Sequence, residues 1–352
     1  MRHGETIQPD FSYFKEVASA VDLDSARAEL RYAPTGEANA TEGEQTLPVI
    51  IAHPAVRRGN EVVISGNAFS DEPGRPENLP LAQLCAAALG RTVVIVGSPS
   101  VESIRRERIF EPGEKTTLGD LSRHERSGDM NNGQLEELRA GRFGRIGKAS
   151  IAAAIAALEI EGINDPNFVL YGSSQAAATS MGMLGALLSG EHMPKVSGVV
   201  LAEGVNYEKW KSKRHLIQTF VTNGQLFVPD ALESNPEPVR RSGESPKIWI
   251  ARTAMSAIAN ARYMSALAQG EAFSDIGSGS DQVEALQGVP VLLTRGSISE
   301  LSTEDANLAM MTHLARHGAN VDLKTHPHHS HSYTMSSGAA IGAIRQVLPQ
   351  AA

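Results

Sequence analysis

The stretch that most constrains the fold of this chain runs from Phe168 to Ala178, with the sequence FVLYGSSQAAA. Four apolar residues lead into Gly-x-Ser-x-Ala, and a segment rich in small residues continues to Leu188. This succession predicts a buried strand that turns sharply into a helix, because small side chains let a helix pack closely on a sheet. The stretch therefore favours an α/β architecture around it.

Ser174 is the residue that this turn presents. A serine on so tight a turn adopts a strained backbone, and the residues two positions before and after it face each other closely. Gly172 and Ala176 are small enough to flank Ser174 in this way, whereas the residues around Ser173 are too large. Ser174 is thus the candidate nucleophile, and the backbone N–H of Gln175 is a candidate donor to developing negative charge.

The composition is that of a globular protein with a full core, since 41% of the 352 residues are hydrophobic and 20% are charged. The net charge of −8 leaves no basic face for nucleic acid or an anionic membrane. The first residues lack the apolar run of a signal sequence, and no run approaches the roughly 18 apolar residues of a membrane span. We therefore expect a cytoplasmic protein with a small-molecule substrate, no nucleic-acid partner and no membrane insertion.

One local cluster of positive charge departs from this acidic balance. It either meets an anionic substrate or is a solvated helix face. The sequence leaves both readings open, as it does the oligomeric state, and the residues of the cluster are Lys209, Lys211, Lys213 and Arg214.

The single cysteine, Cys85, excludes an internal disulfide and a cysteine-based metal site. Four histidines lie between 326 and 331, but one turn without a second group of ligands rarely makes a closed metal site. No Gly-x-Gly-x-x-Gly follows the first strands, and no Gly-x-x-x-x-Gly-Lys-Ser/Thr occurs. We expect no metal and no cofactor.

Alternating strand and helix patterns extend along most of the chain. Short β-branched runs closed by turn residues predict strands at 27–34, 47–52, 61–65, 91–96, 168–171, 196–205, 289–294 and 321–325. Helical patterns lie at 79–89, 146–160, 175–188, 302–317 and 337–347. This alternation favours an α/β fold with a mostly parallel central sheet flanked by helices.

The alternation stops at 206–287, where several helical stretches occur without a strong strand. We expect this segment to be an inserted helical cap. The sheet and its helices would then form one core in two parts, at 1–205 and 288–352.

The partners of a nucleophilic serine are expected at one edge of the sheet. A serine needs a base that takes its proton and an acid that orients the base. Parallel strands bring their carboxyl ends to the same edge. The strand at 289–294 is followed by Glu300, with Glu304 and Asp305 as further acids, and the last strand is followed by the histidine-rich turn.

This order of serine, acid and histidine on these strands resembles the α/β-hydrolase superfamily. The resemblance covers the chain from about residue 27 onward, with 206–287 at the usual place of a variable cap. It implies Glu300 as the acid, in an Arg-Gly-x-x-Ser-acid motif, although many members place an Asp where Ser299 stands. The distance to the closing helix in the family favours His331 as the base, with His329 as the alternative.

The same resemblance implies a second donor to the oxyanion, from the loop after the third strand. Gly66 allows a close approach there, so the N–H of Asn67 or Ala68 is expected to join that of Gln175. The pair His53-Pro54 also follows a strand and is the alternative.

The function implied is a serine hydrolase that cleaves an ester or related acyl bond of a small, partly apolar substrate. Ser174 would attack, His331 would carry the proton and Glu300 would orient His331. A peptidase, a C–C hydrolase, an acyltransferase and a cofactor-free haloperoxidase would use the same residues. A non-catalytic ligand-binding protein with this fold is the alternative outside catalysis.

Overall fold

The computed structural model describes most of the chain. The described residues are 8–38, 43–66, 78–101, 104–106, 121–123, 129–189, 194–224, 226–236, 239, 246–276 and 286–349. Within these ranges, no helix has the length and apolar character that a membrane crossing demands.

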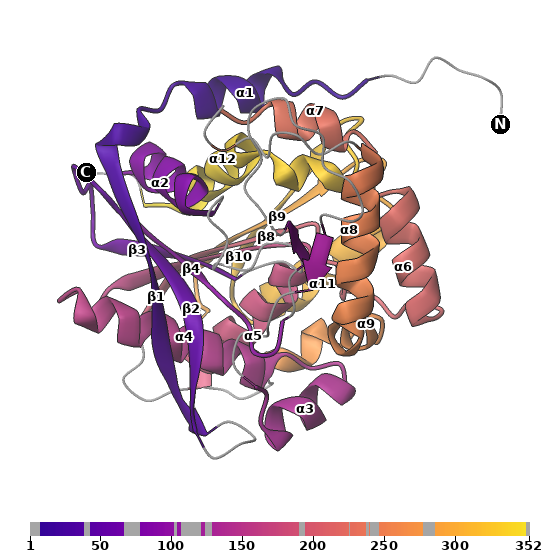
Figure 1. Ribbon diagram of the computed structural model, residues 1–352, viewed down its shortest axis with the longest axis horizontal. Helices are drawn as coiled ribbons and strands as arrows, with labels where there is room; N and C mark the ends of the chain where they lie inside the picture. Colours follow the sequence, from indigo (N-terminus) through magenta and orange to yellow (C-terminus); the bar gives the residue numbers. More distant parts are fainter. Residues whose placement is uncertain are drawn as a thin grey trace.

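Eight strands form one central sheet (Figure 1). Their order across the sheet is β1 (Ala26–Ala38), β2 (Glu44–Pro54), β4 (Thr92–Val96), β3 (Glu61–Gly66), β7 (Asn167–Ser173), β8 (Val196–Ala202), β9 (Pro290–Gly296) and β10 (Asn320–His326). Strand β2 is antiparallel to both of its neighbours, and the strands from β4 to β10 are parallel. The predicted mostly parallel sheet is confirmed. A separate antiparallel pair joins β5 (Ile104–Arg106) and β6 (Leu121–Arg123).

Helices cover both faces of the sheet (Figure 1). One face packs against α4 (Gly144–Ile160), α5 (Gln175–Ser189) and α11 (Glu304–Arg316), and the other against α2 (Asn78–Leu89) and α12 (Ser337–Val347). Successive side chains of a strand point to opposite faces, so Phe168 and Leu170 join the first core, and Val169 and Tyr171 the second. Burial on both faces explains why the central strands are almost continuously apolar.

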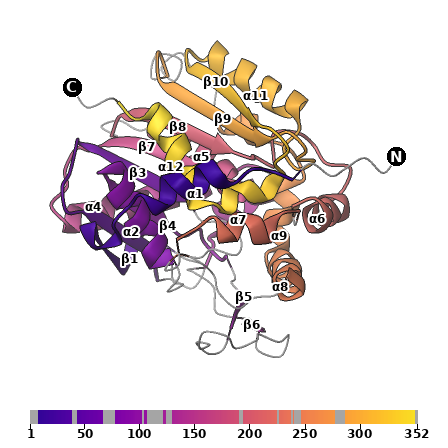
Figure 2. The ribbon, with the colours of Figure 1, turned by 90° about the horizontal axis from the view of Figure 1, so that it is seen from above.

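The described N-terminal segment packs on the second face. Helix α1 (Ser12–Ser19) lies across α12 (Figure 2). The rings of Phe11 and Phe14 contact the ring of His329 at centroid distances of 4.8 and 5.5 Å. The chain start is thereby joined to the turn after the last strand.

Only helical elements are described between β8 and β9. They are α6 (Lys213–Thr222), α7 (Val228–Glu233), α8 (Pro246–Ala259), α9 (Ala261–Leu267) and a 3₁₀ turn (Ala272–Asp275). Their buried side chains, such as Leu216 and Tyr263, share a core with Phe143 at the start of α4 and Leu138 of α3 (Asn132–Arg139). The helical content expected for 206–287 is therefore present, and its action as a cap stays a prediction.

Candidate active site

Ser174 occupies the tight turn between β7 and α5, with a left-handed φ of 57°. A β-carbon at Gly172 would lie 2.5 Å from the carbonyl oxygen of Ala176 and 2.5 Å from Oγ of Ser180. Only glycine fits at this position, because such distances are shorter than real contacts. The strained serine and the required small neighbour give the turn the form of a nucleophile elbow.

His331 is the histidine that meets Ser174. Its Nε2 atom lies 2.9 Å from Oγ of Ser174. The residue begins a 3₁₀ turn (His331–Met335) that follows β10, and it is only 4% exposed. The ring of Phe220, from α6, packs edge-on against the imidazole at a centroid distance of 5.6 Å. The imidazole is thus held between the elbow and a helix of the inserted segment.

The alternative histidine, His329, is directed elsewhere. Its Nδ1 atom bonds to the carbonyl oxygen of Pro327 at 2.8 Å, and its ring packs against the aromatic rings of the N-terminal segment. The structure does not bring His329 to Ser174.

Glu203 supplies the carboxylate that faces His331. Its Oε2 atom lies 3.1 Å from Nδ1 of His331, and the residue is completely buried. The hydroxyl of Ser299 donates to Oε2 at 2.6 Å, and the backbone N–H of Gly296 donates to Oε1. Three partners fix this carboxylate, as a buried charge requires.

The expectation that Glu300 lies beside the histidine is wrong. Glu300 is exposed, and its backbone N–H donates to Oδ1 of Asn223 at 3.0 Å. Of the further acids, Glu304 has a 68% exposed side chain that faces Arg295, and Asp305 stands exposed in the first turn of α11. The carboxylate position at His331 is filled from β8 instead of from the loop after β9.

A signal for Glu203 exists in the sequence. The residue directly follows the apolar run Val199–Ala202 and precedes a glycine. The strand predicted at 196–205 would place Glu203 inside the sheet. In the structure, β8 ends at Ala202 and Glu203 has a left-handed backbone with φ 56°. The acid therefore stands at the same carboxyl edge as Ser174.

Gln175 starts helix α5, so its backbone N–H lies among the free N–H groups of a helix N-terminus, where negative charge is favoured. The residue is 1% exposed, and among the described residues neither side-chain amide atom has a hydrogen-bond partner. Asn67 and Ala68 lie outside the described residues, so their part in an oxyanion hole stays a prediction. Gly66, directly before them, ends β3 beside α5, because a β-carbon there would lie 3.6 Å from Cβ of Ala176.

The alternative oxyanion segment, His53-Pro54, lies at the opposite edge of the sheet. Strand β2 is antiparallel to β4, so its end is next to the start of β4, where Nδ1 of His53 is 3.4 Å from the hydroxyl of Thr92. Nε2 of His53 pairs with Glu161 at 3.3 Å. This pair is not part of the site.

No protein-family model and no curated protein sequence matches the chain. Among solved structures, a carboxyl esterase from the fungus Tuber melanosporum aligns over 92% of this chain and 87% of its own, with 10% identity and a TM-score of 0.51. The chain has the α/β-hydrolase fold.

Two further solved structures align over most of their length. The alignment with a bacterial heroin esterase covers 98% of this chain and 95% of the esterase, with 17% identity and a TM-score of 0.48. The alignment with a thermostable esterase from Pseudomonas putida covers 95% of this chain and 85% of the esterase, with 15% identity and a TM-score of 0.46. The mostly parallel eight-stranded sheet with its flanking helices confirms the predicted fold class.

Burial disfavours the charged form of two histidines beside the site, His326 and His329. Burial lowers the pKa of His326 to about 4, helped by the charges of Lys324 and His329. Burial also lowers the pKa of His329. The hydroxyl of Tyr333, which packs on His326, hydrogen-bonds with that of Thr294 at 2.7 Å. The turn that carries His331 therefore packs on aromatic rings and on two histidines whose charged form is disfavoured by burial.

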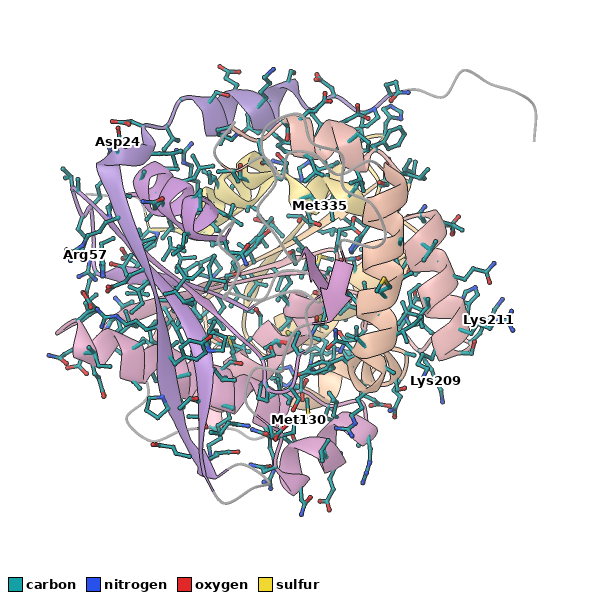
Figure 3. The ribbon with its side chains drawn as sticks, in the orientation of Figure 1. Asp24, Arg57, Met130, Lys209, Lys211 and Met335 are labelled. Atoms are coloured by element: carbon teal, nitrogen blue, oxygen red, sulfur yellow. The ribbon has the colours of Figure 1, made fainter. Side chains whose placement is uncertain are left out.

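The described part of the chain contains no group of three or more His, Cys, Asp or Glu side chains arranged to hold a metal ion. Of the basic cluster, Lys209 and Lys211 are exposed and lie at the outer edge of the molecule (Figure 3). This position fits a solvated face.

Proposed function

We propose that the protein is a serine hydrolase that cleaves an ester or related acyl bond of a small, partly apolar substrate. One observation carries the proposal: Oγ of Ser174, the imidazole of His331 and the carboxylate of Glu203 form a continuous chain of hydrogen bonds at 2.9 and 3.1 Å. The three residues come from three different strand ends, and this geometry suits nucleophilic catalysis by serine.

The first half of the reaction forms an acyl-serine. Oγ of Ser174 attacks the carbonyl carbon while Nε2 of His331 takes the hydroxyl proton. The oxyanion that develops accepts a hydrogen bond from the backbone N–H of Gln175, at the positive end of α5. A second donor is expected from the N–H of Asn67 or Ala68. When the intermediate collapses, the C–O bond to the alcohol breaks and His331 returns the proton to the leaving oxygen.

The second half uses the same groups with water as the nucleophile. His331 takes a proton from water, which attacks the acyl carbon. When this second intermediate collapses, the C–O bond to Ser174 breaks, His331 returns the proton to Oγ and the carboxylic acid is released. Glu203 accepts the hydrogen bond from Nδ1–H, holds the imidazole in the reactive tautomer and stabilises the imidazolium that forms.

The hydrogen bonds of Glu203 serve this role. Gly296, the last residue of β9, and Ser299, in the loop where the acid was expected from the sequence, donate to the carboxylate. These hydrogen bonds compensate for the removal of the carboxylate from water and hold it in position. We propose that Ser299 and Gly296 position the acid of the triad.

Hydrolysis of p-nitrophenyl acetate and butanoate by the wild type and Ser174→Ala tests this function. We expect turnover by the wild type and loss of at least about a thousandfold in kcat in Ser174→Ala. Ser197→Ala, which removes a hydroxyl at the far end of β8, is the matched control and should keep its activity. Absence of turnover by the wild type, with Ser174 still reactive toward a fluorophosphonate, would contradict the ester substrate but not the nucleophile.

A further inference from the structure

A cavity of about 130 Å³ lies beside the elbow, on the face of the sheet that α2 and α12 cover. Three segments next to residues of the site contribute to its wall. Ser173 immediately precedes the nucleophile, Gly66 ends the strand before the expected oxyanion donors, and Thr334 follows His331 by one turn. Since successive Cα atoms are about 3.8 Å apart, the wall of the cavity begins one residue from Ser174.

On two of the lining strands, β3 and β7, the side chains change from polar near the carboxyl edge to apolar farther from it, whereas β4 contributes only the apolar Val93 and Ile95. On β3 the first lining side chain beyond Gly66 at the strand end is that of Ser65, and the next one inward is Val63. On β7 the order is Ser173 and then Tyr171. The polar lining residues of β3 and β7 therefore lie at the edge where Ser174 stands.

The two helices show the same gradient. Both start at the carboxyl edge, where Asn78 and Ser337 line the cavity. The next lining side chains follow at spacings of three or four residues along the same face of each helix, and they are apolar. The lining residues farthest from the edge are Cys85 on α2 and Ile344 on α12. Seven residues of helix span about 10 Å, so the cavity is a narrow pocket with an apolar floor.

The roof over this pocket is held in place by hydrogen bonds. Asn235, after α7, donates to the carbonyl oxygen of Met335 at 2.9 Å and accepts from the backbone N–H of Ser337 at 2.7 Å. Met335, which is labelled in Figure 3, lines the pocket together with Leu232. The inserted helical segment thus closes the pocket against the turn that carries His331.

The volume limits what the pocket can hold. An apolar protein cavity of roughly 150 Å³ takes one benzene molecule. A pocket of about 130 Å³ therefore accommodates a group of up to about six carbon atoms. Longer chains would require the helices to move apart, which close packing resists.

We propose that this pocket binds the acyl chain of the substrate and restricts the enzyme to short acyl groups, of about four to six carbons. The inference rests on the proposed function, because it assigns a place to the acyl group bound to Ser174. The acyl group stays on the serine through the second half of the reaction, whereas the alcohol must leave before water enters. A pocket whose wall includes Ser173, directly before the nucleophile, suits the group that stays.

Three variants test the assignment with p-nitrophenyl esters of two to ten carbons, in which the leaving group is constant. Cys85→Leu fills the apolar floor, and Ile344→Ala enlarges it. Ile341→Ala is the matched control, because Ile341 is equally buried on the same helix and in the same core but does not line the pocket. Ile341→Ala reports the effect of a lost core side chain alone.

We expect kcat/KM of the wild type to peak at butanoate or hexanoate. Cys85→Leu should lower the ratio of hexanoate to acetate hydrolysis by at least about tenfold, since each methylene group in such a pocket is worth roughly ten- to two-hundredfold. Ile344→Ala should move the optimum to a longer chain. Ile341→Ala should keep the optimum of the wild type.

An unchanged chain-length profile in both pocket variants, with acetate turnover retained, would overturn the assignment and leave the proposed function standing. The assignment would also be overturned if the pocket variants instead changed the dependence of kcat/KM on the length of the alcohol. This dependence is measured with acetate esters of the alcohols from methanol to hexanol. Failure of the proposed function is recognised separately, because the wild type would then neither hydrolyse p-nitrophenyl acetate nor bind a fluorophosphonate at Ser174.

Discussion

The Nδ1 atom of His331 and the Oε2 atom of Glu203 lie 3.1 Å apart, although 128 positions separate the two residues. Strand β8, directly beside the elbow strand, delivers the carboxylate. The end of β9 and the loop after it contribute donors to the carboxylate, from Gly296 and Ser299. The acid and its support therefore come from two neighbouring strand ends.

Exchange of Glu203 separates the two candidate acids. We expect Glu203→Gln to lower kcat on the order of a hundred- to ten-thousandfold with little change in KM, because an amide no longer fixes the histidine tautomer. Glu300→Gln removes an exposed carboxylate of the same size and should change kcat by less than about twofold. Steady-state kinetics on one ester decides between them, and the reverse ranking would contradict the assignment.

The two histidines are distinguished in the same way. His331→Ala should lower kcat by at least about a thousandfold, since no other base reaches Ser174 among the described residues. His329→Phe keeps an aromatic ring against Phe11 and Phe14 and should retain activity within a few fold. Equal losses in both variants, with unchanged circular dichroism spectra, would count against His331 as the single base.

Glycine 172 should not tolerate a methyl group. Gly172→Ala places Cβ 2.5 Å from the carbonyl oxygen of Ala176, so we expect a loss of about 2–4 kcal/mol in the free energy of unfolding. Gly342→Ala is the control, because the nearest atoms to its Cβ are at 3.9 Å on Tyr13. On helix α12 this change should stabilise by up to about 1 kcal/mol. Urea denaturation measures both, and a neutral Gly172→Ala would contradict the close approach at the elbow.

His326 should make the protein sensitive to acid. Its pKa is about 4 in the folded chain and 6.5 as an ordinary value, so the unfolded state binds the proton more readily. The stabilisation is fully present above pH 6.5 and is lost as pH falls through 4, by up to roughly 3 kcal/mol. His326→Phe should flatten this part of the stability profile, measured by urea denaturation from pH 7 to 4. An equally steep decline in the variant would show that other groups cause it.

Activity should be independent of metal ions. The proposed steps use only the hydroxyl, imidazole, carboxylate and backbone N–H groups named above. Dialysis against EDTA should leave kcat within experimental error, and a loss that zinc or magnesium restores would overturn the metal-free mechanism.

The elbow could be predicted from the sequence because its requirements are local. The positions two residues before and after Ser174 decide whether the turn can form, and both are visible in a short stretch. The close contact at Gly172 bears out this argument. The alternation of strands and helices is likewise a local pattern, and it gave the correct fold class.

The acid could not be placed with the same certainty, since which carboxylate reaches the histidine is a non-local property. The catalytic partners of the serine are expected after the carboxyl ends of the parallel strands. Glu203 follows β8 and Glu300 follows β9, so both meet this condition. The resemblance to the α/β-hydrolase superfamily favoured the acid after the strand at 289–294. The strand predicted at 196–205 was three residues too long and so included Glu203. The left-handed backbone of Glu203, which turns it toward His331, has no signature in the sequence.

The most direct test of the central claim is the labelling of Ser174 with a fluorophosphonate, followed by intact mass and peptide mapping. We predict one label per chain, located on Ser174, with the label absent in Ser174→Ala and strongly slowed in His331→Ala. Folded wild-type protein that takes up no label, or takes it up equally in Ser174→Ala, would contradict the account of Ser174 as an activated nucleophile.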